Sequence, residues 1–167
     1  MDKWDACAFP VQPDELKGRV CYGGLDLSST TDITAFVLVF PPQDEADNYV
    51  VLPYFWIPEE NVSLRVRRDH VPYDVWQKQG FLHTTEGNVV HYDYIEKFIE
   101  TMGEQYNIRE IAFDRWGAVQ MVQNLEGMGF TVVPFGQGFK DMSPPTKELM
   151  KLTLEKKIAH GGYPVLR

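Results

Sequence analysis

The fold is decided by residues 20–40, which read VCYGGLDLSSTTDITAFVLVF. An apolar run over residues 20–27 ends in the polar loop 28–32, and a second apolar run over 33–40 follows at once. The second run is almost entirely β-branched, aromatic or aliphatic, which is typical of a strand buried on both faces. The segment therefore predicts two adjacent strands joined by a polar loop, with Asp26 near the end of the first strand.

The next part of the chain predicts one more strand and two short helices. Residues 49–57 form an apolar run, and Pro53 within it removes a backbone donor, so this third strand is expected at the edge of a sheet. Residues 62–71 and 73–79 predict short helices, and 82–91 predicts a small hairpin or strand.

The second half of the chain alternates between helical and strand patterns. Ile95, Phe98, Ile99 and Met102 recur at helical spacing, and a short apolar strand over 109–114 follows and ends in a carboxylate. A second helical stripe, a strand over 130–135 and a helix from Pro144 to about Ile158 complete the pattern. Three strands in a meander followed by helix, strand, helix, strand and helix predict a mixed α/β domain.

Size and composition fit one globular domain. The chain has 167 residues, 44% hydrophobic and 24% charged, and no apolar run of the length needed to cross a bilayer. No signal peptide is recognisable, so a cytoplasmic setting is expected. Cys7 and Cys21 have no ligand-type spacing and are interpreted as free buried thiols. We expect residues 1–18 to be a lead-in segment or linker and 19–167 to be the folded domain.

Two aspartates close apolar strands and suggest a metal site. Asp26 ends the first strand and Asp114 the fourth, and a helical connection makes these strands candidates for parallel neighbours. Adjacent strands lie roughly 4.8 Å apart, so carboxylates at matching ends can share a cation. Two carboxylates holding two metal ions form the usual arrangement for phosphodiester hydrolysis. Alternatively, Asp26 is a turn residue and Asp114 a helix cap.

Several segments resemble one family. Residues 24–32, 113–118 and 160–167, together with 135–139 before a lysine-rich helix, resemble the nuclease domain of phage and prophage terminase large subunits. The resemblance covers roughly residues 18–167. It implies an RNase H-like mixed α/β fold, with a five-stranded sheet in the order 3-2-1-4-5 flanked by helices.

The resemblance also implies roles for individual residues. Asp26 and Asp114 match the first two catalytic acids of the family and would bind Mg²⁺ or Mn²⁺ in a two-metal site. Asp32 matches an additional acid near the metals, and a loop-capping aspartate is the alternative. The implied function is an endonuclease that cuts concatemeric double-stranded DNA during genome packaging in the bacterial host cytoplasm.

The chain also departs from the family pattern. It lacks the GxxxxGK[ST] phosphate loop of the ATPase domain that precedes the nuclease in such terminases. In the full protein, that ATPase domain, a small terminase subunit and the portal are the expected partners. The third catalytic acid of the family is expected beyond Arg167, and Tyr163 stands where many relatives carry Asn. We therefore expect an incomplete site, with weak or no cleavage by this chain.

The net charge of −8 leaves few candidates for DNA binding. Lys140, Lys147 and Lys151 form the best phosphate-facing strip, although a solvated helix face is the alternative. Residues 65–68 hold three arginines that could contact a backbone or pair with nearby acids. His160 could contact the site, or be an ordinary histidine at a helix end.

Two other classes of protein remain as alternatives. An actin-like ATPase shares this type of sheet, but such phosphate loops place glycine where this chain has Ser28. A non-catalytic DNA-docking or protein-interaction domain differs from the enzyme by having no dependence on metal.

Overall fold

The computed structural model describes residues 1–28, 32–114 and 118–167. The strands are β1 (Val20–Asp26), β2 (Thr34–Phe40), β3 (Tyr49–Pro58), β4 (His83–Thr85), β5 (Asn107–Asp114), β6 (Val132–Phe135) and β7 (Ile158–Ala159). The α-helices are α1 (Asp2–Asp5), α2 (Val62–Asp69), α3 (Tyr73–Lys78), α4 (Tyr92–Gln105), α5 (Val119–Gly127) and α6 (Phe139–Leu154). Three short 3-10 helices are η1 (Pro13–Leu16), η2 (Glu59–Asn61) and η3 (Pro164–Leu166). None of the helices in these described ranges is long and hydrophobic enough to cross a membrane.

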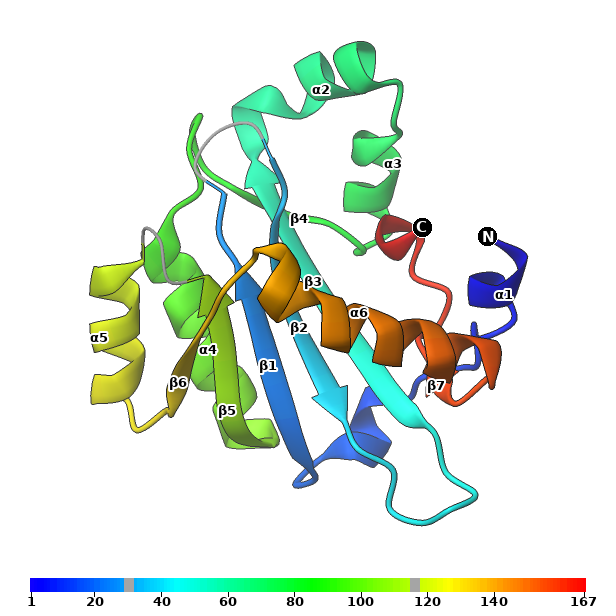
Figure 1. Ribbon diagram of the computed structural model, residues 1–167. Coiled ribbons are helices and arrows are strands. Elements are labelled where there is room, and N and C mark those ends of the chain that lie inside the picture. The colour runs from blue at the N-terminus through cyan, green and yellow to red at the C-terminus, as the bar shows by residue number, and fades with distance from the viewer. Residues whose placement is uncertain (29–31, 115–117) are drawn as a thin grey trace.

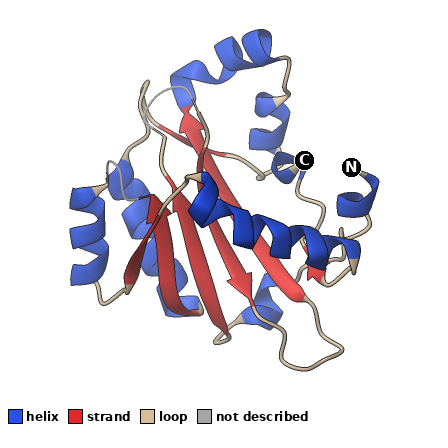
Figure 2. Ribbon diagram, viewed as in Figure 1, coloured by secondary structure: helices blue, strands red, loops and turns tan. Residues whose placement is uncertain are grey.

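The strands form one mixed sheet with helices on both sides (Figures 1 and 2). β1 pairs with β2 and β2 with β3 in antiparallel fashion, whereas β1, β5 and β6 are parallel neighbours. The resulting order β3-β2-β1-β5-β6 is the predicted order 3-2-1-4-5 of an RNase H-like sheet, with β1 at its centre. The predicted α2 and α3 helices and the strand after them are also present.

Two short strands enlarge the predicted five-stranded sheet to seven. β7 pairs with the start of β3 at Tyr49, and β4 pairs with its end from Trp56 to Pro58. The expectation that Pro53 marks a free edge was therefore wrong for the ends of β3. Pro53 lies between the two pairings, opposite Val37 of β2, in the part of β3 that neither β4 nor β7 reaches.

Side chains alternate between the two faces of the sheet, as the twofold period of a strand requires. On β1, Cys21, Gly23 and Leu25 are buried on one face, whereas Tyr22 and Asp26 are exposed on the other. Burial raises the pKa of the Cys21 thiol to about 12, so this cysteine stays protonated, and both cysteines are free and buried as predicted.

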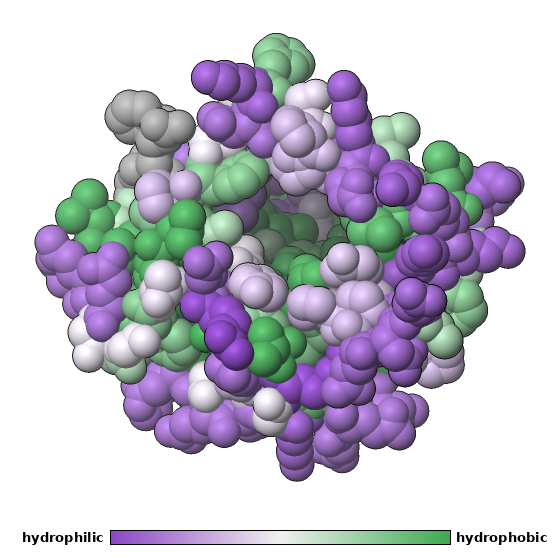
Figure 3. Space-filling model, turned by 60° about the horizontal axis from the view of Figure 1, so that its bottom comes forward, coloured by the Kyte–Doolittle hydropathy of each residue, from purple (hydrophilic) through white to green (hydrophobic). Residues whose placement is uncertain are grey.

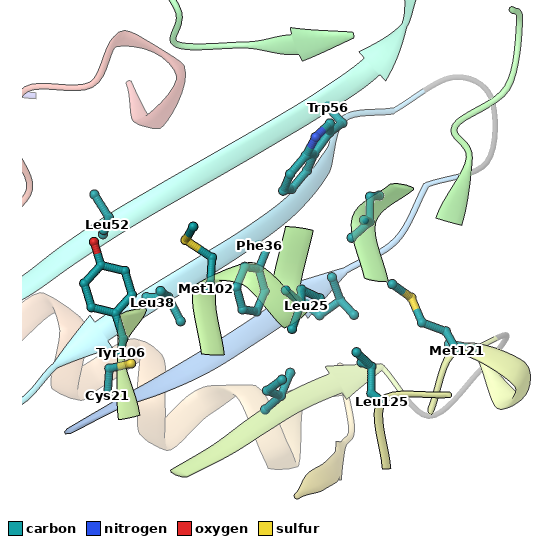
Figure 4. Packing of buried hydrophobic residues seen from close by; sticks show 14 of the residues in the cluster. Cys21, Leu25, Phe36, Leu38, Leu52, Trp56, Met102, Tyr106, Met121 and Leu125 are labelled. Atoms are coloured by element: carbon teal, nitrogen blue, oxygen red, sulfur yellow. The ribbon is translucent and has the colours of Figure 1, made fainter. Parts of the chain in front are cut away.

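The buried face of the sheet is covered by α4 and α5. Figure 4 shows side chains of β1 and β2 meeting Met102 of α4, with Met121 and Leu125 of α5 close by. Ile95 and Ile99 of α4 are completely buried, which explains the helical stripe in the sequence. This contact forms the main hydrophobic core.

The opposite face is crossed by α6 (Figure 1). This helix begins at Phe139 and not at the predicted Pro144, so Pro144 and Pro145 lie inside it. Both prolines are exposed, so the carbonyl groups that they leave without an N–H partner can bond to water. The helix also ends at Leu154, earlier than predicted, because Lys156 adopts a left-handed conformation (φ 56°) and the chain then enters β7.

A second hydrophobic cluster forms where the far end of β3 meets α2 and α3. Phe55 and Ile57 of β3 pack there with Val62, Tyr73 and Leu82. α2 also contacts the loop between β1 and β2. Arg65 of α2 is buried, and its guanidinium donates a hydrogen bond of 3.2 Å to the Asp32 carbonyl oxygen.

Candidate metal centre

Asp26 and Asp114 lie at the carboxyl ends of two neighbouring strands. β1 and β5 are parallel, and the register pairs Leu25 with Phe113, so the aspartates are the next residue on each strand. Residues two apart on a strand point to the same face, so Asp114 shares its face with Ala112, and Asp26 with Gly24. Both carboxylates therefore lie on the face of the sheet that α6 crosses. The predicted meeting of two strand-ending aspartates is therefore found in the structure, and their role as ligands stays a prediction.

Both aspartates line one groove. It has a volume of about 420 Å³ and is bounded by the sheet on one side and by Met142 and Pro145 of α6 on the other. Apart from the carboxylates and Gln137, the lining side chains are mainly hydrophobic. Seen from below, the surface of the molecule is hollowed, and hydrophobic residues lie at the base of the hollow inside a hydrophilic rim (Figure 3). By its lining residues, the groove that holds the two carboxylates has little other polar surface.

Several effects act on the carboxyl group of Asp26. Partial burial raises its pKa above the ordinary value of 3.8, and the negative charges of Asp114 and Asp32 raise it further. A side-chain hydrogen bond from Gln137 acts in the opposite direction and lowers it. Mutual repulsion between carboxylates is relieved when a cation binds between them. The electrostatics therefore suit a site for a positively charged ligand.

Asp32 lies close enough to influence Asp26, but the chain holds it mainly through its backbone. Its N–H donates to the Ser28 hydroxyl oxygen at 3.0 Å, and its carbonyl oxygen accepts from Arg65. Within the described ranges, no group of three or more histidine, cysteine, aspartate or glutamate side chains is arranged to hold one metal ion. The structure thus places Asp32 beside the aspartate pair and not within a three-ligand cluster.

The loop that carries Asp32 is anchored from the core, which the sequence did not reveal. Thr34 is fully buried, and its hydroxyl accepts from the Ser28 N–H at 3.0 Å and donates to the Ser28 carbonyl oxygen at 3.2 Å. The Tyr92 hydroxyl of α4 also donates to the Ser28 carbonyl oxygen at 3.3 Å. These bonds fix the chain directly after Asp26.

The predicted DNA-binding lysines are all exposed on α6. Lys140, Lys147 and Lys151 are spaced by seven and four residues, which places them along one side of the helix. None of the ion pairs found among the described residues involves them.

The alternative arginine cluster is less suited to DNA. Arg65 is only 3% exposed and is turned toward the 28–34 loop, so it cannot follow a DNA backbone. Arg68 forms an ion pair with Asp69, which was the alternative interpretation of this segment. Of the two interpretations of this segment, the structure shows the ion pair for Arg68 and removes Arg65 from contact with a DNA backbone.

His160 has a structural role away from the aspartates. It follows β7 and not a helix end, it is 2% exposed, and its ring stacks on Trp4 at a centroid distance of 4.2 Å. Its Nδ1 accepts from the Gly162 N–H at 3.1 Å, so Nε2 donates to the Trp4 carbonyl oxygen at 2.8 Å. Both ring nitrogens are thereby used within the fold. Trp116, which follows Asp114 by two residues in the sequence, lies outside the described residues.

Strand order and helical layers together define the class of this domain as RNase H-like. The chain belongs to the family of terminase large subunit endonuclease domains, which matches residues 1–167. This membership argues against the actin-like ATPase alternative.

Relatives at different levels of similarity agree with this assignment. The large terminase subunit of Enterobacteria phage HK97 is 38% identical over 98% of this chain, and its crystal structure superposes with a TM-score of 0.83 at 36% identity, over 99% of this chain and 34% of that one. The large terminase nuclease of thermophilic phage G20c superposes with a TM-score of 0.59 at 11% identity, over 98% of this chain and 76% of that one. That nuclease has also been solved with bound zinc and with bound magnesium.

The match with longer relatives is partial. The chain covers 32% of the HK97 large subunit and 37% of Protein YmfN from Escherichia coli K12, to which it is 24% identical. It therefore spans about a third of the length of the curated relatives that it matches.

Proposed function

We propose that this chain acts as a divalent-metal-dependent endodeoxyribonuclease domain that cuts concatemeric double-stranded DNA during viral genome packaging. The observation that carries the proposal is the position of Asp26 and Asp114, which close adjacent parallel strands and share one groove. Ligands of open α/β sheets commonly gather at the carboxyl ends of strands. The family membership supports the nuclease chemistry.

The donor atoms available fit a hard cation. Asp26 and Asp114 offer carboxylate oxygens only, and Mg²⁺ and Mn²⁺ both prefer oxygen ligands and retain several waters. A bound pair of such ions supplies an activated water and counter-charge for the leaving oxygen of a phosphodiester. That the distantly related G20c nuclease was solved with magnesium and with zinc agrees with a divalent site.

The residues of the chain itself would bind and orient the substrate. The two aspartates hold their carboxylates on the ends of rigid strands, and hydrogen bonds to Thr34 and Tyr92 hold Ser28, two residues after Asp26, in place. The other side chains that line the groove are mainly hydrophobic, so the carboxylates are its main charged groups. Lys140, Lys147 and Lys151 would hold the phosphate backbone, since the net charge of −8 otherwise repels DNA.

Binding of Mn²⁺ tests this proposal directly. We expect calorimetry to detect Mn²⁺ binding to the wild-type chain and no binding to the Asp26→Asn/Asp114→Asn variant, which keeps the shape of both side chains. Equal signals from the two proteins would discard the metal site and leave the non-catalytic docking domain as the better description.

Cleavage by this chain should be weak. Only two carboxylates are at the centre of the site, and the described residues offer no cluster of three ligand side chains. We therefore expect little nicking of supercoiled plasmid with Mg²⁺ or Mn²⁺. Efficient cutting that disappears in the Asp26→Asn/Asp114→Asn variant would show that two carboxylates are enough.

Partners and setting of the whole protein are also proposals. We infer an ATPase domain, a small terminase subunit and a portal as partners, in the bacterial host cytoplasm. The support is the family membership together with the fact that the chain covers 32% of the HK97 large subunit.

A further inference from the structure

Gln137 lies in the turn that connects the sheet to α6. It follows Phe135, the last residue of β6, whose register partner on β5 is Asp114. Directly after Gln137 the chain reaches Gly138, the N-cap of α6, and the helix then crosses the face of the sheet that carries the carboxylates (Figure 1). The turn therefore brings Gln137 back from β6 toward the middle of the sheet.

The side chain of Gln137 reaches the Asp26 carboxylate. The two side chains are within hydrogen-bonding reach, and the amide lowers the pKa of the Asp26 carboxyl. Gln137 follows β6 and Asp26 ends β1, so the turn spans the width of β5, which lies between these strands. Gln137 also lines the same groove as Asp26 and Asp114. The contact is therefore part of the groove that holds both carboxylates.

The chemistry of an amide suits this position. A glutamine N–H can donate to a carboxylate without neutralising it, so the carboxylate keeps its charge for a cation. A lysine or arginine here would compete with the cation, and a glutamate would add a third negative charge and could not donate. Partners that orient ligand carboxylates in this way commonly change metal affinity by roughly 10- to 100-fold when they are removed.

We propose that Gln137 is a positioning residue of the metal site, which holds the Asp26 carboxylate in the orientation that shares a cation with Asp114. This inference rests on the proposed function, because it assigns Gln137 a role at the same site. Gln137 acts through Asp26 and not on the substrate.

Mn²⁺ affinity of the Gln137→Met variant tests the proposal. Methionine has nearly the same length as glutamine but does not donate a hydrogen bond, so we expect Mn²⁺ to bind about tenfold more weakly. Gln123→Met is the matched control, since Gln123 is exposed on α5, away from the groove. Free Mn²⁺ is followed by electron paramagnetic resonance, and the melting temperature is measured in EDTA.

The outcomes separate the role of Gln137 from that of the site. Weaker Mn²⁺ binding with an unchanged metal-free melting temperature supports the proposal, because a residue that only supported the fold would lower that temperature. Unchanged affinity, or a loss of affinity that only accompanies a lower metal-free melting temperature, overturns it. If the Asp26→Asn/Asp114→Asn variant bound Mn²⁺ as well as wild type, the proposed function itself would fail and this role with it.

Discussion

The two faces of the sheet are covered to very different degrees. On one face, α4 and α5 pack fully buried side chains such as Ile99 and Leu125 against the strands. On the other face, α6 has 16 residues and none of them is buried, and two of its large hydrophobic side chains, Met150 and Leu154, are about 60% exposed. The groove with Asp26 and Asp114 is on this second face.

The packing that stabilises the fold and the candidate metal site are on opposite faces of the sheet. Tight packing behind β1 and β5 fixes the strands, while the open face leaves the ends of the same strands accessible. The carboxylates are thereby held on rigid elements without being buried by them, as a preorganised site requires. The following variants test whether the two faces divide the work in this way.

The largest effect is expected on the closed face. Leu125→Ala should lower the free energy of unfolding by about 2–5 kcal/mol, because Leu125 is completely buried and its truncation leaves a cavity. Leu149→Ala on α6 is the matched control, since Leu149 is 47% exposed, and it should change stability by less than about 0.5 kcal/mol. Urea denaturation followed by circular dichroism measures both, and equal losses would remove the distinction between the faces.

A smaller effect is expected where the core anchors the loop after Asp26. Thr34→Val keeps the shape of the side chain but leaves the Ser28 N–H without its acceptor, which should cost about 1–3 kcal/mol. The same variant should also weaken Mn²⁺ binding, because Ser28 directly extends the segment that carries Asp26. If the Thr34→Val protein were destabilised but bound Mn²⁺ with wild-type affinity, the anchoring of Ser28 would not contribute to the metal site.

DNA binding should depend on the open face alone. Lys147→Ala/Lys151→Ala should weaken binding to a DNA duplex and reduce the slope of log Kd against log salt by about 2, because two phosphate contacts are removed. Arg67→Ala/Arg68→Ala serves as the control and should leave the slope unchanged. Fluorescence anisotropy in EDTA gives both slopes. A reduced slope in the arginine variant and an unchanged slope in the lysine variant would indicate that DNA binds at α2 instead.

The smallest effect concerns charge within the groove. The pKa of Asp26 is raised in the fold, so the folded protein holds this proton more tightly and loses stability as the pH rises above the ordinary value of 3.8. Asp26→Asn should therefore raise the metal-free melting temperature at pH 7, by only about 1 °C because solvent screens the carboxylate. The gain should shrink as the pH falls toward 4, and excess Mn²⁺ should reverse the order of the two proteins. A variant that melts lower than wild type at pH 7 without metal would contradict the proposed repulsion.

Much of the closed face could be predicted from sequence. The stripe at Ile95, Ile99 and Met102 and the apolar runs of β1, β2 and β5 follow directly from packing against the core, so their periods appear in the chain. Asp26 and Asp114 could be predicted as neighbours for the same reason, because each closes one of these runs.

The strands beside β3 and the start of α6 were harder to predict. β4 and β7 have three and two residues, too short for a pattern, and their pairing depends on the path of distant segments. The start of α6 was misplaced because its prolines are exposed, where water satisfies the backbone. Gln137 lies in the segment 135–139 that resembles the family, but its role beside Asp26 depends on how the chain turns after β6 and could not be predicted from the pattern.

The contacts around His160 also determine how the domain would respond to tension. Both ends of the chain lie on the same side of the molecule (Figure 1), and residues 4–9 are bonded to residues 160–167, with the His160 and Gly161 N–H groups donating to Cys7 and Phe9. A force that pulls the two termini apart would load these few bonds and the stack on Trp4 before it reached β1 or β5. Mechanical load would therefore first separate residues 4–9 from residues 160–167. The strand ends that carry Asp26 and Asp114 would stay in place until these contacts had broken.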